Sequence, residues 1–273
     1  MQRIDLRAGT VAYAVEGVGP PVVLLHAIGH DHRDFDAILP ALARHHRTIA
    51  IDWPGFGSSP APDPPSSASA ALMCDVLEQF VDALDLEPAI YVGNSVGGTA
   101  AVRLAARRPE RVRGLVLVDT GGFTPMTAVA RMFCLVQGRA WVRRTTGLAF
   151  ARFYTKRRHA HADAMLDRVA AALREPASVA VHAAVWRSFA ERESDMRGVA
   201  VECPTLVVWG HRDPVLRASV DGAAVRATIP HAQWLELDTG HVPFVEDPHA
   251  FIEATMPFLA SLRPPAQSDT RTK

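Results

Sequence analysis

The sequence predicts an α/β fold, in which helices cover both faces of a mostly parallel sheet. The first observation is a set of continuous apolar runs, typical of strands buried on both faces, at residues 21–25, 48–51, 88–92, 112–118 and 205–209. The second is that segments with helical spacing separate these runs, and strand–helix alternation is typical of a parallel sheet. With 48% hydrophobic residues in 273, the chain can bury a large core.

The remaining elements follow in order along the chain. Residues 2–6 and 10–16 have the pattern of two short strands joined as a hairpin at Ala8-Gly9. Helical spacing predicts helices at 35–43, 69–86, 99–108, 218–229 and 249–262, and a last strand is expected at 233–237. The polar residues 264–273 are expected to form a disordered tail.

The region 123–198 interrupts this alternation. It has no clear buried strand and is helical in composition. It follows the strand at 112–118, and catalytic loops gather at the carboxyl ends of the strands in such sheets. We therefore expect residues 1–122 and 199–263 to form one core domain, with 123–198 inserted as a helical cap over its carboxyl edge.

The bulk composition narrows the classes of function. Lysine plus arginine (29) equals aspartate plus glutamate (29), so net charge gives no indication of a nucleic-acid partner. The three cysteines are widely spaced, which suits a reducing compartment and gives neither a disulfide framework nor a zinc spacing. No signal peptide and no apolar stretch of roughly 18 residues is found. The expectation is a cytoplasmic protein without a membrane span, and its oligomeric state is left open.

The sequence Gly93-Asn94-Ser95-Val96-Gly97 lies between a predicted strand and a predicted helix. Strand, sharp turn and helix are the context that a nucleophile elbow requires, in which a strained turn lifts a serine hydroxyl clear of the sheet. Glycine on either side removes side chains that would collide in so tight a turn. The alternative without a catalytic role is a glycine-rich turn whose serine caps the helix. Ser95 is therefore the candidate nucleophile.

Laid out together, these residues resemble the α/β-hydrolase fold family over nearly the whole chain. Five matches occur in the family's order: His26-Ala27-Ile28-Gly29, residues 52–59, the elbow from Gly93 to Gly98, Gly210-His211-Arg212-Asp213, and Gly240-His241. The chain order Ser, Asp, His is also that of the family. The resemblance implies a mostly parallel sheet with a helical cap, and a serine hydrolase activity that needs no cofactor and no metal.

The resemblance assigns a role to three residues. Ser95 is the nucleophile, and His241, in a loop after the last strand, is the base that takes its proton. Asp213 is expected to orient and stabilise His241. Asp119, at the end of the strand that follows the elbow, is the alternative acid, because some family members place their acid there.

Two backbone N–H groups are expected to form the oxyanion hole. The first belongs to Val96, at the start of the helix after the elbow, and the second to Ile28, in the loop after the strand at 21–25. The sequence departs from the family at Ala27, where glycine is usual. If this position required a left-handed backbone, the alanine would strain the loop or shift it.

Cationic residues without intervening acids mark the first half of the cap: Arg131, Arg139, Arg143, Arg144, Arg152, Lys156, Arg157 and Arg158. The interpretation without a functional role is a basic face exposed to solvent. The sharper hypothesis is that one or two of these arginines face the cleft and favour an anionic substrate; a basic membrane contact is a third alternative. Trp186 and Val242 are the predicted substrate contacts. His26, His30 and His32 lack the further ligands of a metal site.

The expected function is hydrolysis of an ester, lactone or related acyl bond in a small to medium substrate, through an acyl-enzyme. A carbon–carbon bond hydrolase of the ring-fission-product type is the second possibility. Such enzymes share the Gly-Asn-Ser-x-Gly-Gly elbow but usually have tryptophan where this chain has Val242. A slow-turnover ligand receptor and a non-hydrolytic lyase are further alternatives, since a fold does not determine function.

Overall fold

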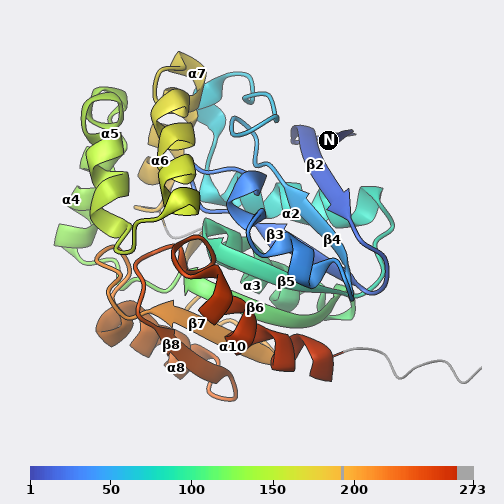
Figure 1. Ribbon diagram of the computed structural model, residues 1–273. Coiled ribbons are helices and arrows are strands. Elements are labelled where there is room, and N and C mark those ends of the chain that lie inside the picture. The colour runs from blue at the N-terminus through green and yellow to red at the C-terminus, as the bar shows by residue number, and fades with distance from the viewer. Residues whose placement is uncertain (192–193, 263–273) are drawn as a thin grey trace, which may run out of the picture.

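A computed structural model describes residues 1–191 and 194–262 of the chain, and within them eight strands form one sheet (Figure 1). The order across the sheet is β1-β2-β4-β3-β5-β6-β7-β8. The strands are β1 (Gln2–Leu6), β2 (Gly9–Glu16), β3 (Pro21–Leu25), β4 (Arg47–Ile51), β5 (Ala89–Ser95), β6 (Val112–Thr120), β7 (Thr205–Gly210) and β8 (Gln233–Leu237). The first two are antiparallel to their neighbours, and the others run parallel. The predicted fold class is confirmed.

Alternate residues of the central strands enter two separate cores. In β3, Val23 and Leu25 belong to one hydrophobic cluster, whereas Val22 and Leu24 belong to the other. This alternation is the period of two that a strand imposes on its side chains. The first core is closed by α2 (Ala70–Ala83), α3 (Val96–Arg107) and α8 (Ala223–Thr228), and the second by α1 (Leu39–Leu42), α9 (Pro243–Glu246) and α10 (Pro248–Ser261).

Two predicted helices differ in the structure. Instead of one helix at 35–43, a 3₁₀ turn (His32–Phe35) precedes the four-residue α1. Pro40 has no N–H, so a continuous helix over 35–43 would lose a hydrogen bond there, whereas in the first turn of α1 none is lost. Instead of one helix at 218–229, a π-helical turn (Ala218–Gly222) leads into α8. The tail expected at 264–273 lies outside the described residues.

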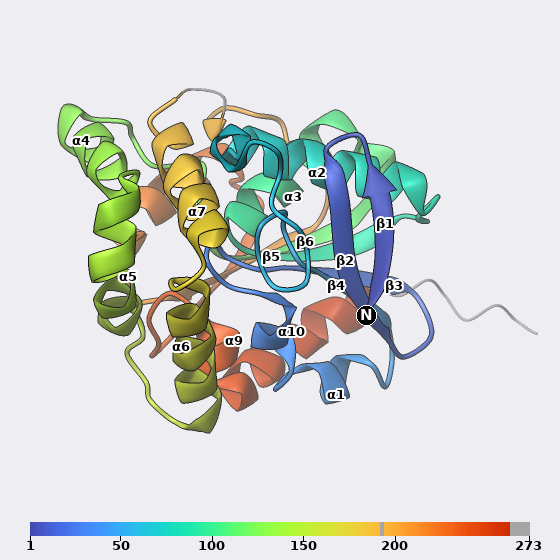
Figure 2. The ribbon, with the colours of Figure 1, turned by 90° about the horizontal axis from the view of Figure 1, so that it is seen from above.

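In the described part of the segment between β6 and β7, four α-helices group at one end of the sheet (Figures 1 and 2). They are α4 (Ala128–Gln137), α5 (Ala140–Tyr154), α6 (Ala160–Ala172) and α7 (Pro176–Ser188). Among the described residues, no helix is both long and apolar enough to cross a membrane. The division into a core and a cap at residues 123 and 198 remains a prediction, and these four helices are the segment to which it refers.

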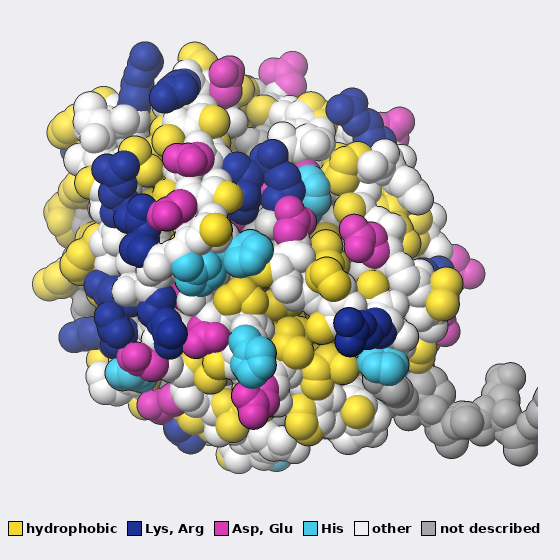
Figure 3. Space-filling model, in the orientation of Figure 1, with side chains coloured by type: hydrophobic (Ala, Val, Ile, Leu, Met, Phe, Trp, Pro, Cys, Tyr) yellow, Lys and Arg dark blue, Asp and Glu magenta, His cyan; other side chains and the backbone are white. Residues whose placement is uncertain are grey.

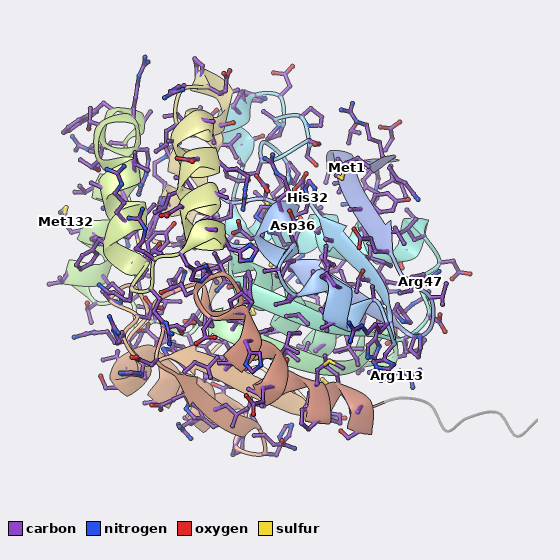
Figure 4. All side chains as sticks on the ribbon, viewed as in Figure 1. Met1, His32, Asp36, Arg47, Arg113 and Met132 are labelled. Carbon is purple, nitrogen blue, oxygen red and sulfur yellow. The ribbon has the colours of Figure 1, made fainter. Side chains whose placement is uncertain are left out.

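The outer side of these helices carries apolar and cationic side chains together. Lys and Arg side chains gather over this part of the surface in Figure 3. Met132 points outward from α4, far from Arg47 and Arg113 at the other end of the molecule (Figure 4), and 61% of its surface is exposed. The exposed cations of α4 and α5 therefore occupy a mixed surface.

Candidate active site

Ser95 ends β5 and directly precedes α3, in a backbone conformation that non-glycine residues rarely adopt. Its φ and ψ are 55° and −117°. A Cβ added at Gly93 would lie 2.5 Å from the carbonyl oxygen of Gly97, and one at Gly97 would collide with Leu25. The glycines therefore permit the turn, as the sequence suggested. The Ser95 side chain makes no capping hydrogen bond to α3, which argues against the interpretation that it is a helix cap.

His241 and Asp213 form a buried hydrogen-bonded pair at the ends of two neighbouring strands. Asp213 follows β7 and His241 follows β8, and their Nδ1 and Oδ2 atoms lie 2.7 Å apart. Asp213 Oδ1 also accepts the N–H of Val215 at 2.7 Å, which fixes the carboxylate. A carboxylate on Nδ1 sets the tautomer in which Nε2 can accept a proton.

Ser95 and His241 line the same cavity, which has a volume of about 580 Å³. Its floor comes from the carboxyl ends of the strands, and its wall comes from α4, α5 and α7 together with the loop after β6 and the segment after β7. Ile28, one expected oxyanion donor, lines the cavity as well. The structure thus brings the predicted nucleophile, base and one donor residue into a single space.

The loop after β3 resolves the question about Ala27. Ala27 is not among the residues with positive φ, and Gly29 takes the left-handed conformation instead, with φ 82°. A Cβ at Gly29 would lie 2.5 Å from the ring of His182, so glycine is needed there on steric grounds too. The alanine therefore imposes no strain. Val96 is the first residue of α3, so its N–H has no acceptor one turn earlier in the helix.

Asp119 lies beside the His241–Asp213 pair but binds a different partner. Its carboxylate accepts the N–H of Gly210 at 2.9 Å, and its backbone φ is 38°. Full burial, and then the neighbouring charge of Asp213, raise the pKa of Asp119 well above its usual range. A protonated Asp119 can donate to Asp213. Of the two candidate acids, Asp213 is the one that contacts His241.

Among the described residues, the side chains of Asp119, Asp213 and His241 are close enough together to share a cation. Their ligand atoms lie within 4.8 Å of one another. However, His241 Nδ1 and Asp213 Oδ2 are already joined by a hydrogen bond, and Asp119 is held by Gly210. These hydrogen bonds already hold the three side chains in their positions.

Glu246, a residue that the sequence analysis missed, organises the backbone around His241. Its carboxylate accepts N–H groups on both sides of His241, from Gly240 at 2.9 Å and Val242 at 3.2 Å. It also accepts those of Lys156 and Arg157 after α5, at 2.7 and 2.9 Å. The buried carboxylate therefore ties the histidine loop to the helical segment. A glutamate five residues after a loop histidine was the available signal.

Asn94 was noted only as part of the elbow motif. Its side-chain N–H₂ group donates to the backbone carbonyls of Val118 and His241, both at 3.0 Å. The residue before the nucleophile thus anchors the loop that carries the base.

A second histidine–carboxylate pair, also missed, lies in the cavity wall. His30 Nδ1 is 2.5 Å from Asp34, and His30 Nε2 is 2.7 Å from the hydroxyl of Tyr154. Arg168 donates to Asp34 at 2.7 Å. Tyr154 packs edge-on against His241, with ring centroids 5.5 Å apart. This network therefore fixes the position of Tyr154, whose ring packs against the ring of His241.

The structure separates the two predicted substrate contacts. Trp186 lines the cavity. Val242 does not: its side chain is fully buried in the second core, and its N–H is held by Glu246. The prediction for Val242 is corrected accordingly, because the turn that starts α9 directs this side chain into the core.

The eight cationic residues of the helical segment all lie in the described part of the chain, and they divide sharply. Arg143 is buried, with 1% of its surface exposed, and lines the cavity. The other seven are at least partly exposed. Two of them pair with acidic residues, Arg157 with Asp247 at 2.9 Å and Arg158 with Asp163. Most of the run is a solvated basic face, and one member faces the cleft.

Comparison with known proteins agrees with this geometry. The sequence profile of the alpha/beta hydrolase fold matches residues 20–174, more than half of the chain. The chain therefore belongs to the alpha/beta hydrolase fold family.

Curated relatives include hydrolases of several kinds. An uncharacterized protein of Mycobacterium tuberculosis is 28% identical, covering 93% of this chain and 79% of the relative. Lipase 1 of Psychrobacter immobilis is 27% identical over 86% of this chain and 76% of its own length. The 2-hydroxymuconate semialdehyde hydrolase of a Pseudomonas species is 38% identical, but over 41% of this chain and 40% of the enzyme.

Solved structures with the same fold include esterases. A thermophilic esterase from Thermogutta terrifontis has a TM-score of 0.81 and 25% identity, covering 97% of this chain and 100% of its own. A hydrolase from Pseudomonas aeruginosa has a TM-score of 0.81 and 28% identity, covering 94% and 97%. The family and these neighbours support a hydrolase.

Proposed function

We propose that the chain is a cofactor-independent serine hydrolase that cleaves an ester, lactone or related acyl bond of a small to medium substrate. One observation carries the proposal. Ser95, held in a left-handed turn, and His241, hydrogen-bonded to Asp213 at 2.7 Å, line one cavity of about 580 Å³. A nucleophile, an oriented base and enclosed space for an acyl group are what this chemistry requires.

In the proposed reaction, Ser95 Oγ attacks the carbonyl carbon while His241 takes the hydroxyl proton. Asp213 stabilises the resulting imidazolium. The N–H groups of Val96 and Ile28 donate to the oxyanion, and each such donor contributes about 3 kcal/mol in the transition state. The imidazolium then protonates the leaving alkoxide, which departs as an alcohol, and the acyl group stays on Ser95.

Water completes the cycle. His241 removes one proton from a water molecule, whose oxygen attacks the acyl carbon. Collapse of the second tetrahedral intermediate returns the proton to Ser95 Oγ and releases a carboxylic acid. The four helices α4–α7 act in this proposal as a cap that encloses the acyl group.

The test is hydrolysis of p-nitrophenyl esters with acyl chains of two to eight carbons. Wild-type protein is expected to release p-nitrophenol, and Ser95→Ala is expected to retain less than about one part in 10⁴ of the activity. A Ser66→Ala variant, which changes an exposed serine, is the matched control. Full activity in Ser95→Ala would contradict the proposal.

Carbon–carbon bond hydrolysis is a second candidate, and one observation favours it. The 2-hydroxymuconate semialdehyde hydrolase is 38% identical over 115 residues, and this chain has the elbow Gly93-Asn94-Ser95 discussed above. Val242, in place of the usual tryptophan, disfavours it. A ring-fission dienone turned over faster than every ester would move this candidate to first place.

A further inference from the structure

Arg143 has an unusual environment for a charged side chain. It projects from α5, is 1% exposed, and lines the cavity that also contains Ser95. Its guanidinium lies over the rings of Phe150 and Trp186, at 5.2 and 5.9 Å from their centroids. Aromatic faces attract a cation without neutralising it. Burial lowers the pKa of Arg143 to about 10, so the group remains charged at neutral pH.

The guanidinium uses little of its donor capacity. Nη1 donates to Gln137 Oε1 at 2.5 Å. Nε is buried without an acceptor, and Nη2 makes no hydrogen bond to any described residue. Nε and Nη2 form the edge of the fork that holds a carboxylate through two parallel hydrogen bonds. The edge best suited to an anion is therefore the one left open.

Trp186 adds a third open donor at the same place. Its indole Nε1 is buried and also has no acceptor. Trp186 and Arg143 are in contact, both line the cavity, and an indole N–H can only donate. Unpartnered buried donors are uncommon in folded proteins, so two on touching residues of one cavity indicate a missing acceptor.

No described residue accepts a hydrogen bond from these three open donors. Among the described residues, no carboxylate pairs with Arg143. Three acidic residues line the cavity, but Asp221 accepts from Thr124 and from the N–H of Arg217, Asp195 pairs with Arg197, and Glu191 is exposed. Gly147, one turn after Arg143, keeps this space free, since a Cβ there would lie 3.1 Å from Nη2.

We propose that Arg143 and Trp186 form a carboxylate subsite, and that the substrate is an acyl compound with a carboxylate remote from the bond that Ser95 attacks. The Nε–Nη2 edge of Arg143 holds the two carboxylate oxygens, and the indole N–H of Trp186 donates to one of them. The aromatic rings around the guanidinium accept the apolar chain between the carboxylate and the scissile bond. This inference deepens the proposed function and rests on it for the identity of the reacting bond.

The test measures binding without turnover. Glutarate, adipate and suberate are titrated by calorimetry into Ser95→Ala protein, with dimethyl adipate as the uncharged match. We expect at least one diacid to bind, and to bind at least tenfold more weakly when Arg143→Met is added. Arg144→Met, which removes the exposed neighbouring cation, is expected to leave binding unchanged. Trp186→Phe, which keeps the ring and removes the N–H, is expected to weaken binding about threefold.

Several results would overturn the subsite. They are equal diacid binding by the Arg143→Met protein, an equal loss in Arg144→Met, tighter binding of dimethyl adipate than of adipate, or no diacid binding at all. Tighter binding of hexyl phosphate than of any diacid would overturn the carboxylate assignment. Arg143→Lys keeps the charge and removes the fork, so intermediate affinity is expected even if Arg143→Met folds poorly.

The same proteins separate this proposal from the proposed function. If wild type hydrolyses p-nitrophenyl butyrate but Ser95→Ala binds no diacid, the subsite fails and the serine hydrolase stands. If wild type hydrolyses no ester while diacids bind through Arg143, the hydrolase fails and the subsite stands. Both proposals would be supported together if wild type preferred mono-p-nitrophenyl adipate over p-nitrophenyl hexanoate at least tenfold in kcat/KM. This preference should be lost in Arg143→Met.

Discussion

The proposed catalytic side chains at the carboxyl edge of the sheet differ in their hydrogen bonding from Arg143 and Trp186 in the helices above it. At the sheet edge, Asp213, His241 and Glu246 each have a hydrogen-bond partner, and Glu246 alone accepts four backbone N–H groups. In the helices, Arg143 and Trp186 leave donors open. Satisfied networks hold geometry, whereas open donors await an acceptor. This difference agrees with the proposal that the edge holds the reaction geometry and the helices bind the substrate.

The largest effect is expected from Asp213→Asn, which leaves the shape of the network and removes its charge. We expect kcat for p-nitrophenyl butyrate to fall about 10⁴-fold, because an amide on Nδ1 favours the wrong tautomer of His241. Asp119→Asn is the matched control. Since Asp119 is held by Gly210 and its raised pKa favours the neutral form, we expect less than a tenfold loss. Reversal of these two losses would make Asp119 the acid.

Glu246→Gln should have the next largest effect. An amide accepts through one atom only, and its N–H₂ group would face N–H donors that now bind a carboxylate. We expect the free energy of unfolding to fall by about 2 kcal/mol in urea titrations, and kcat to fall roughly tenfold. Glu253→Gln, on the exposed side of α10, is the control. Unchanged stability and activity would show that the edge does not depend on this network.

The effect of Arg143→Met on the free energy of unfolding tests the interpretation of the open donors in the helices. Replacing an unpaired buried charge by an apolar side chain of similar length should be stabilising, so we expect the free energy of unfolding without ligand to rise by about 1 kcal/mol. Thermal unfolding of this variant and of Arg144→Met would measure it. A loss of several kcal/mol in Arg143→Met would instead give the cation a structural role.

The smallest effect concerns pH. An acid whose pKa is raised on folding binds its proton more tightly in the folded state. The free energy of unfolding should therefore decrease as pH rises above 3.8, the ordinary aspartate pKa, and this contribution should level off above the folded pKa of Asp119. In Asp119→Asn the contribution is absent. Parallel pH profiles of unfolding for the two proteins would contradict the protonation state assigned to Asp119.

The two regions also differ in how far the sequence predicted them. The elbow was predictable because a strained turn demands glycine at Gly93 and Gly97, so its geometry leaves a local signature. The sequence favoured Asp213 as the acid but left Asp119 as an alternative, because both residues lie at the same edge of the sheet and the loops decide which carboxylate reaches Nδ1.

The wall of the cavity was much less predictable. Arg143 and Arg144 are adjacent and identical in type, yet one is buried and the other exposed. Which of them faces inward depends on the rotation of α5 against α4 and α7, which no local pattern encodes. The prediction for Val242 was wrong for a similar reason, because the turn into α9 determines where its side chain points.

The proposed hydrolysis depends most directly on an activated Ser95. The decisive measurement is reaction with a fluorophosphonate probe, read by intact mass, for wild type, Ser95→Ala, Asp213→Asn and His241→Ala. We expect one adduct on wild type, none on Ser95→Ala, and much slower labelling of Asp213→Asn and His241→Ala. Wild type that does not label, or Ser95→Ala that labels as fast as wild type, would contradict the proposed hydrolysis.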